Sequence, residues 1–591
     1  MKNIYKAFLS AVACLTAGAF LSSCDVEPEV YSAVTPEVFF QSKEAVWARF
    51  LRPYTHYRWW MCYRDSPRFQ LVENGADDII CFNWDDYLPN MHHHQFDPDA
   101  GIYGDGFMQL NRGIATAYDC LKDLEQNIDW EELGFTKEDK ASLIAQMYCI
   151  VANQFMQGLD MYGGMPLYTV ESAELLPRAT AKETFDFIVK MLEDNMKQIP
   201  NKPSADTENT TAVYKAWAAM MLAELYINAK VYTDGAVEPM YEECAKICQD
   251  LIDGKYGPYK LADSFQELFG IGNEHCSEII FAMPANDDEF QLDAGITRFF
   301  LPTDGNSYLG GTDYSVKNRA GIQPSHKPDG TSYDFKLGRV MEKFTEGDVR
   351  VQPFHFEGDT YYGQFLMGYM KNPSSHADES WVATGSKAYK NKVLYMTDAM
   401  AEFHNAGGVD HWDENGVPYD ASGNAIPMSN FSSLPSNTDT WEESCLVRLI
   451  KVTPPVDNTL YKGNYEFPEM CPISRLTLAY YLLAECKFAQ GDKAGAANLI
   501  NTVRKRYFVN GNDPDPVTAA NLDKYRLADE FLIEFLGEHR RRSDLIRWGM
   551  FTTEKWWDHE PDGADKSYLQ RFPIGQEILS TNPLYKENPG Y

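Results

Sequence analysis

Helical hydrophobic periodicity is confined to the first and last thirds of this chain, and this distribution constrains the fold more than any other feature of the sequence. A helix is predicted at 181–198, where Thr180 and Glu183 have the spacing of a capping box and Ile188 and Leu192 follow at helical spacing. The same reasoning predicts helices near 42–57, 107–127, 137–161, 211–232, 238–253, 473–489, 493–507 and 528–547. The predicted fold class is therefore mainly α.

The middle of the chain has a different composition. Between about 284 and 470, Gly, Pro, Asn, Asp and Ser recur every few residues, as is typical of turns and loops. A strand-like run at 278–283 lies close to this segment. We therefore predict long loops and small β-hairpins here, and loops of this length in a compact protein are usually functional.

Two predicted helical pairs resemble repeats. Within 476–504, small residues such as Ala479 and Ala497 occur at positions that let two antiparallel helices approach closely, a pattern that resembles a tetratricopeptide unit. The segment 213–254 has a similar pattern, although an insert at 231–240 disturbs the period. Each pair taken alone is also compatible with an ordinary helical hairpin.

The first residues are typical of a targeting signal. Lys2 and Lys6 precede an apolar run at 7–21 that has the length of a signal-peptide core and is too short for a membrane span. The run ends in Leu21-Ser-Ser-Cys24, which resembles a bacterial lipobox. We therefore predict a lipoprotein signal peptide at 1–23 and lipidation of Cys24, with a plain secretory signal as the alternative. Lipid on Cys24 would then be the only membrane attachment.

The charge of the chain limits its partners. With 53 Lys and Arg against 86 Asp and Glu, the formal charge is −33, which argues against nucleic acid, because phosphate binding needs a basic surface. The same charge argues against docking on anionic lipid through a basic patch. Aromatic residues make up 14% of the chain, a supply that suits a large core or ring-lined binding surfaces.

No metal site or cofactor is predicted. The ten cysteines outside the signal and the lipid site lack the dense spacing of a disulfide scaffold, and we expect most to be buried thiols. Cys244 and Cys248 share a helix face, but no neighbouring ligands complete a zinc site. The histidine run 92–94 is predicted to be a solvated surface segment. The segment 411–422 resembles an EF-hand loop but fails at two ligand positions, so a turn is predicted there and a structural calcium ion is not indicated.

A stretch at 530–549 combines aromatic and apolar residues with Glu and a cluster of Arg, as expected for an amphipathic helix whose arginines pair with carboxylates. It also resembles the hallmark helix of the SusD/RagB family of outer-membrane nutrient-binding lipoproteins. Matching elements occur in family order at 34–40, 162–167, 177–180, 344–350, 572–577 and 588–591. Two departures, Ser543 before Asp544 and Gly575 in place of a second proline, affect structural motifs and not ligand contacts.

The resemblance implies a fold and a partner. The fold is a platform of about four tetratricopeptide-like helix pairs with loops and small hairpins packed on it, as one structural unit with an N-terminal part at 24–270 and a C-terminal part at 271–591. The partner is a SusC-like TonB-dependent outer-membrane transporter. The family members lie on the extracellular face of the outer membrane, where they capture oligosaccharides, or peptides in the RagB branch, and pass them to this transporter.

Carbohydrate capture needs flat rings that stack on sugars and polar groups that bind hydroxyls, so loop aromatics are the candidate site residues. In relatives the ligand site draws on the first long loop and the middle insertion. The predicted ligand-binding residues are Asp78, Trp84, Asp85, Tyr87, Tyr103, Tyr308 and Trp381, with Trp84 as the first candidate. By contrast, Trp47, Trp217 and Trp548 lie in helical patterns and are predicted to be core residues.

We predict that the protein is not an enzyme. The sequence has no nucleophile elbow, zinc-protease motif, P-loop or dinucleotide fingerprint. The predicted function is a cell-surface lipoprotein that binds oligosaccharide or polysaccharide and takes part in polysaccharide utilisation. Two alternatives remain open at this point, a RagB-like peptide-binding lipoprotein and an all-α glycoside hydrolase, and the hydrolase would need regular helices through 284–470.

Overall fold

The structure is a computed structural model. It describes residues 35–62, 66–81, 87–170, 172, 174–270, 272–284, 320–357, 360–369, 395–402, 410–412, 418–426, 432–433, 445–451 and 470–591.

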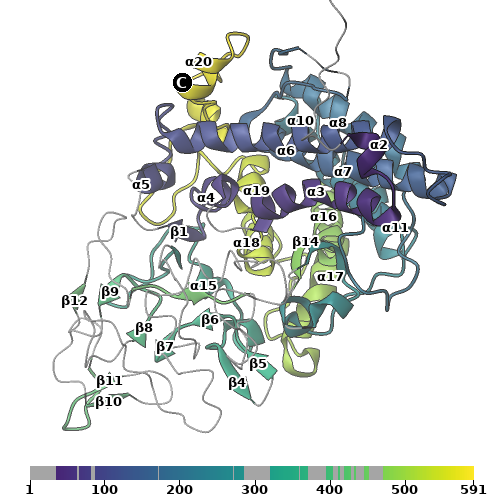
Figure 1. Cartoon of the computed structure of the whole chain (residues 1–591). Helices are drawn as coiled ribbons and strands as arrows, with labels where there is room; N and C mark the ends of the chain where they lie inside the picture. The colour runs from purple at the N-terminus through teal and green to yellow at the C-terminus, as the bar shows by residue number, and fades with distance from the viewer. Residues whose placement is uncertain are drawn as a thin grey trace, which may run out of the picture.

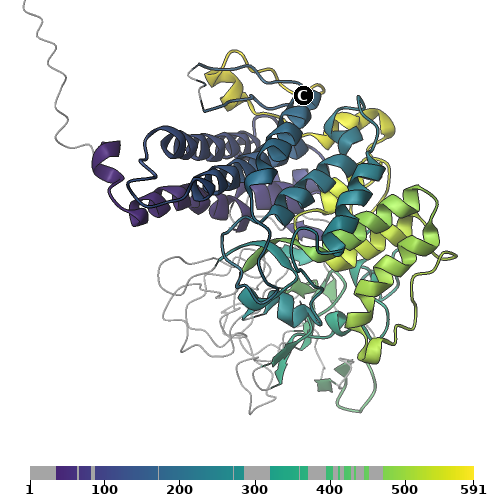
Figure 2. The ribbon, with the colours of Figure 1, turned by 90° about the vertical axis from the view of Figure 1, so that its right-hand side faces the viewer.

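Eight longer helices form a continuous row (Figure 2). They are α3 (Lys43–Cys62), α6 (Gly101–Gln126), α7 (Lys137–Tyr162), α8 (Ala181–Asn195), α9 (Lys215–Ile227), α11 (Tyr241–Ile252), α16 (Leu476–Ala489) and α17 (Lys493–Arg504). Each of them packs on the next in this order, so that α11 contacts α16 although most of the middle of the chain separates them. The predicted platform of four helix pairs is confirmed, as α3/α6, α7/α8, α9/α11 and α16/α17.

Local sequence explains where these helices begin and why they approach closely. The Thr180 side chain accepts a hydrogen bond from the Glu183 N–H, and the Glu183 carboxylate binds the Thr180 N–H in return, which completes the predicted capping box of α8. Small residues line the contact between the pairs, since Ala219, Ala479 and Ala496 are fully buried. Without longer side chains at these positions, neighbouring helix axes can come close together.

The remaining helices lie outside this row, and most of them are short. They are α2 (Pro36–Phe39), α4 (Pro67–Glu73), α5 (Tyr87–His92), α10 (Ala229–Tyr232), α12 (Phe265–Phe269), α15 (Val340–Lys343), α18 (Lys524–Phe535), α19 (Arg541–Arg547) and α20 (Gln576–Thr581). The prediction of one helix at 528–547 was wrong, because the chain breaks between α18 and α19. Gly537 and His539 adopt positive φ angles of 72° and 60° there, and the Glu73 carboxylate accepts the His539 N–H at 2.6 Å.

The strands form seven antiparallel two-stranded sheets among the described residues. These sheets pair β1 (Ile79–Cys81) with β3 (Ala320–Ile322), β2 (Ile279–Met283) with β14 (Cys471–Arg475), β4 (His355–Glu357) with β5 (Thr360–Tyr362), β6 (Phe365–Leu366) with β13 (Arg448–Leu449), β7 (Gly368–Tyr369) with β8 (Tyr395–Met396), β9 (Ala401–Glu402) with β12 (Ser432–Ser433), and β10 (His411–Trp412) with β11 (Pro418–Tyr419). The strand predicted at 278–283 is confirmed as β2. The small strands from β4 to β12 lie together on one side of the helical row (Figure 1).

The three tryptophans that were predicted to be core residues differ in burial. Trp217 is buried and stacks on Phe281, with ring centroids 3.8 Å apart. Trp548 is half-buried and packs against the core. The prediction was wrong for Trp47, whose exposed fraction is 44%, because this face of α3 is not covered by another described element. The largest core draws buried residues from both the N-terminal and the C-terminal parts.

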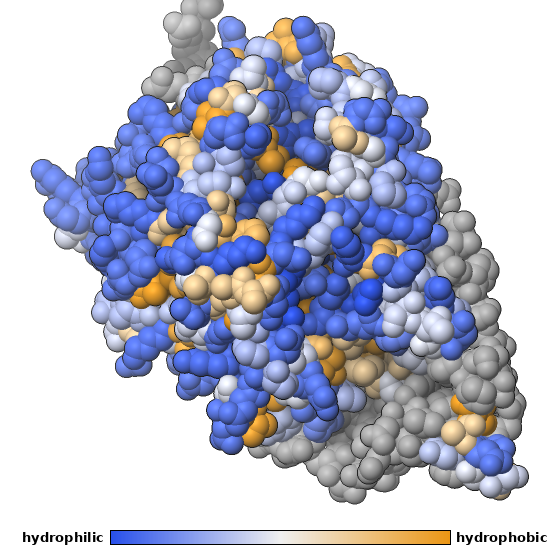
Figure 3. All heavy atoms as spheres, turned by 180° about the vertical axis from the view of Figure 1, so that it is seen from behind, coloured by the Kyte–Doolittle hydropathy of each residue, from blue (hydrophilic) through white to orange (hydrophobic). Residues whose placement is uncertain are grey.

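The surface agrees with the acidic composition. Seen from behind, hydrophilic residues cover most of the molecule, and the hydrophobic ones form small separate groups (Figure 3). None of the described helices combines the length and the apolar character that a membrane crossing needs.

The stretch at 530–549, called the C-terminal signature below, has arginines that pair with carboxylates, as predicted. At its centre, buried Glu534 accepts hydrogen bonds from Arg350 at 3.0 Å, Arg475 at 2.8 Å and Arg506 at 2.9 Å. Further along the signature, Arg541 forms a bidentate pair with Asp77, at 2.6 and 2.7 Å. These ion pairs join α18 and α19 to the strands and to the connection before β1.

Candidate functional site

The two chain regions that were predicted to bind ligand meet at one small sheet. Trp84, Asp85 and Tyr308 lie outside the described residues, but the residues on either side of them are placed. β1 ends at Cys81, which pairs with Ala320 at the start of β3. The segment after Cys81 and the segment before Ala320 therefore leave this sheet at the same end.

The segment that contains Trp381 also begins and ends at one sheet. Trp381 itself lies outside the described residues, as does Cys24. Tyr369 and Tyr395, on either side of that segment, pair with each other in β7 and β8. The Ile322 N–H donates to the Val447 carbonyl at 2.9 Å, which links β3 to the chain just before β13, and β13 pairs with β6. The bases of all three segments thus belong to one small β region (Figure 1).

The structure corrects the role predicted for Asp78, because its exposed fraction is 1%. Its carboxylate accepts the Ile79 N–H at 2.9 Å, and its backbone carbonyl accepts the Gln323 N–H at 2.8 Å. Burial raises the pKa of Asp78 well above its ordinary value, and the negative charges of Glu73 and Asp77 add to this effect. Asp78 therefore shapes the connection into β1 and offers no surface to a sugar.

Tyr103 is likewise an interior residue, which corrects its prediction as a ligand contact. It is 1% exposed, its ring stacks on Phe572 with centroids 5.7 Å apart, and its carbonyl accepts a hydrogen bond from Tyr162 at 2.8 Å. Tyr87 differs, because it is half-buried at the start of α5, with its hydroxyl donating to Gln70 at 2.6 Å. Of the predicted site residues that the structure describes, only Tyr87 is partly accessible.

The prediction of a solvated histidine run was also wrong. His92 and His94 are buried, at 0% and 4% exposure, and His93 is half-buried. They lie against a C-terminal segment at 556–562, and His94 also stacks on Phe551 with centroids 4.2 Å apart. The run begins at the last residue of α5, a short helix that is mostly buried.

This histidine region contains two groups of possible metal ligands. The ligand atoms of His92, His93 and Asp558 lie within 4.8 Å of one another, and so do those of His94, His559 and Asp562. A ring contact between His92 and His559 joins the two groups. His92 also contacts His93 within the first group, and His94 contacts His559 within the second. No motif could have revealed these groups, because their halves are more than 460 residues apart in the sequence.

Burial dominates the protonation of the region. Burial lowers the pKa of His92, and the charges of His93 and His559 lower it further. Burial also lowers the pKa of His94, although Asp562 opposes the change. Burial would raise the pKa of Asp562, but the nearby imidazoles of His559 and His94 outweigh it and hold this pKa below its ordinary range. The imidazoles of His92 and His94 are thus suited to act as neutral ligands.

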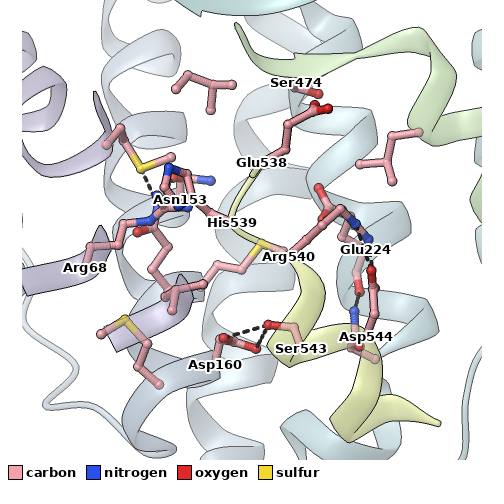
Figure 4. Close-up of a pocket in the computed structure, with 18 of the residues that line it drawn as sticks. Arg68, Asn153, Asp160, Glu224, Ser474, Glu538, His539, Arg540, Ser543 and Asp544 are labelled. Carbon is pink, nitrogen blue, oxygen red and sulfur yellow. Dashed lines mark hydrogen bonds and ion pairs between the residues drawn. The ribbon is translucent and has the colours of Figure 1, made fainter. Parts of the chain in front are cut away.

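A polar cavity of about 130 Å³ lies between α4, α7, α9, β14 and the connection from α18 to α19 (Figure 4). Arg540 reaches Glu224 at 3.3 Å and Asp544 at 3.1 Å on one side, and Ser543 donates to Asp160 on another, at 2.8 and 2.9 Å. The cavity is smaller than the roughly 300–1,000 Å³ of typical ligand pockets. Its charged lining is typical of internal hydration and not of an oligosaccharide site.

Comparison with known proteins assigns the family. The model of the SusD family matches residues 277–591, more than half of the chain. The chain belongs to the SusD family. The starch-binding protein SusD of Bacteroides thetaiotaomicron is 24% identical over 488 residues, with 78% of this chain and 74% of that protein covered. SusD-like protein P25 of Formosa agariphila is 22% identical over 605 residues, with 96% of this chain and 97% of that protein covered.

Solved structures of SusD-like proteins share the fold. A SusD superfamily protein from Parabacteroides distasonis has a TM-score of 0.63 at 15% identity, with 93% of this chain and 99% of that chain covered. Surface glycan-binding protein A from Bacteroides thetaiotaomicron gives 0.62 at 16%, with 93% and 100% covered. A laminarin-binding SusD-like protein gives 0.61 at 17%, again with 93% and 100% covered.

Both departures of this chain from the SusD-family pattern lie at packing positions. Ser543 binds Asp160 at the wall of the polar cavity. Gly575 has a φ of 92°, and a Cβ atom there would lie 3.0 Å from the Gly104 nitrogen, which favours glycine. The two substitutions thus concern the internal packing of this SusD-family member.

Proposed function

We propose that this SusD-family protein is a cell-surface lipoprotein that binds oligosaccharides and delivers them to a SusC-like TonB-dependent outer-membrane transporter, without cleaving them. The observation that carries the proposal is the similarity along nearly the whole chain to family members that are named for the glycans they bind. These are the starch-binding SusD, a laminarin-binding SusD-like protein and surface glycan-binding proteins. Their matches cover 78% to 93% of this chain.

We place the glycan site at the end of the sheet formed by β1 and β3. Trp84 would stack on a sugar ring, and Asp85 would accept hydrogen bonds from hydroxyls. Tyr308 follows in the segment that precedes Ala320, whose pairing with Cys81 supports a shared site. Half-buried Tyr87 begins α5 directly after the segment that contains Trp84. Trp381, from the segment between β7 and β8, would extend the same surface.

The proposed anchor and partner involve the other end of the molecule. Lipid on Cys24 would tether the chain to the outer membrane, on the extracellular face, through the residues before α2. The first two helices after that tether expose four large apolar side chains, with exposed fractions of 39% to 62%: Val38, Phe39, Trp47 and Leu51. Exposed apolar side chains of this kind support a contact with a protein partner, which we propose is the transporter.

The proposal is tested with the chain purified without its signal and lipid site. It is incubated with a panel of polysaccharides, and binding is measured by affinity electrophoresis and calorimetry while reducing ends are counted over time. We expect saturable binding to at least one glycan and a constant number of reducing ends. Progressive release of shorter sugars would show a glycoside hydrolase. Binding of peptides without any glycan binding would show a RagB-like peptide-capture protein instead.

A further inference from the structure

We propose that His94, His559 and Asp562 form a binding site for one divalent transition-metal ion of the zinc class. The site would join the end of α5 to the C-terminal segment at 556–562. This inference is independent of which glycan the protein binds.

The three ligand atoms converge on one point. His94 Nδ1 lies 2.6 Å from Asp562 Oδ2, and His559 Nε2 lies 3.6 Å from the same oxygen. All three atoms are within 4.8 Å of one another. A tetrahedral zinc ion with bonds of about 2.0–2.1 Å separates neighbouring ligand atoms by about 3.3 Å. The distance between His559 and Asp562 is already close to that value. A small rotation of the Asp562 side chain would bring the distance between His94 and Asp562 to the same value.

The hydrogen bonds of His94 set the nitrogen that faces the site. Its Nε2 lies 3.0 Å from the Gly75 carbonyl, which accepts hydrogen bonds only, so Nε2 carries the N–H. In the neutral ring Nδ1 then presents a lone pair, and it points at the Asp562 carboxylate. Either a proton on Nδ1 or a metal ion can hold the two groups together. A backbone carbonyl that holds the outer N–H of an imidazole is a common feature of metal-bound histidines.

His559 supplies an independent indication of a ligand. Its side chain is 2% exposed, and its Nε2 has no hydrogen-bond partner among the described residues. The ring is held in place by stacking on Trp556, with centroids 4.0 Å apart and planes inclined by 11°. Buried polar nitrogens are normally paired, and an unpaired one that points into a ligand group indicates an ion or water that satisfies it.

The donor set selects the class of metal. Two imidazoles and one carboxylate suit zinc, cobalt or nickel, whereas calcium and magnesium prefer sites built only from oxygen. The side chain of Asp562 is 11% exposed, so the ion has an entry path and its fourth position can hold water. Bound there, the metal would fix α5, which begins at Tyr87 directly after the segment that contains Trp84, against the C-terminal segment.

The test uses the whole mature chain, stripped with a chelator and titrated with Co²⁺ and then Zn²⁺. We expect one equivalent of Co²⁺ to bind with the strong visible absorption of a four-coordinate ion, to be displaced by Zn²⁺, and to raise the melting temperature. His559→Phe keeps the ring stacked on Trp556 and removes only the ligand nitrogen. It should abolish the Co²⁺ absorption and weaken binding by about 100-fold or more.

Two further variants complete the test. His275→Phe replaces a histidine whose side chain is 68% exposed and should leave Co²⁺ binding unchanged. His92→Phe removes a ligand from the neighbouring group only. Unchanged Co²⁺ binding in folded His559→Phe, or no stoichiometric binding by the wild type, would overturn the proposal and leave a protonated His94 as the partner of Asp562. Loss of the absorption in His92→Phe but not in His559→Phe would overturn the assignment to these residues.

Discussion

Replacement of Glu534 by glutamine should destabilise this protein strongly although the two side chains have the same shape. Glu534 is 3% exposed and lies within 3.0 Å of three guanidinium groups, while Tyr507 donates to it at 3.1 Å. The surrounding buried cluster contains four cations and four carboxylates: Arg350, Arg475, Arg506 and Lys451, with Asp348, Glu278, Glu534 and Glu538. The substitution therefore leaves one buried positive charge uncompensated.

The pKa of Glu534 gives the magnitude of this effect. Burial would raise it, but the charges of Arg475, Arg506 and Arg350 outweigh burial and lower the pKa from 4.5 to about 2. That difference corresponds to about 3 kcal/mol of folding free energy. Removal of one partner from a buried ion pair costs roughly 3–5 kcal/mol in other proteins. We therefore expect Glu534→Gln to lower the free energy of unfolding by about 3–5 kcal/mol at pH 7.

The dependence on pH provides a second signature. Because the pKa of Glu534 is lower in the folded state, its contribution is fully present above about pH 4.5 and is lost as the pH falls towards 2. The difference in stability between the wild type and Glu534→Gln should shrink across that range. An acid that is exposed in a loop, Glu208, supplies the matched control, and Glu208→Gln should change stability by no more than about 0.5 kcal/mol.

Urea unfolding followed by tryptophan fluorescence measures both effects, with the three proteins compared between pH 7 and pH 3. A loss below about 1 kcal/mol at pH 7 would refute the reasoning, because it would mean that the remaining carboxylates compensate the cluster without Glu534. A difference between wild type and variant that stays constant down to pH 3 would refute it as well.

Three further predictions concern the site, the anchor and the packing. Trp84→Ala should weaken glycan binding by about 1–3 kcal/mol in calorimetry and leave the melting temperature nearly unchanged. Full affinity with a lowered melting temperature would instead show that Trp84 is a packing residue. Cys24→Ala should be exported but lost from the membrane fraction in cells without the transporter, and unchanged retention would show another anchor. Gly164→Ala should cost about 1–3 kcal/mol, because its Cβ would meet the Ala179 carbonyl at 1.8 Å, whereas Gly101→Ala meets nothing within 4 Å and should be neutral or slightly stabilising in the same melting assay.

The positions of the long helices could be predicted because their signals are local. The Thr180 capping box and the apolar spacing after it define α8 within one stretch of sequence. The break between α18 and α19 was missed although Gly537 marks it, because the amphipathic pattern continues past the glycine. The positive φ of His539 also depends on Glu73, which comes from a distant part of the chain.

The candidate sites show the same division. Individual helices, the composition of the middle segment and the resemblance to the SusD family could be read from the sequence, because each depends on patterns within a few tens of residues; the four-pair platform followed from that resemblance. The burial of Asp78 and Tyr103, and the pairing of Cys81 with Ala320, became visible in the folded structure. It alone brought His94 next to Asp562, 468 residues away. Burial and pairing at such separations result from how the helices and sheets pack together, and no local pattern in the chain specifies them.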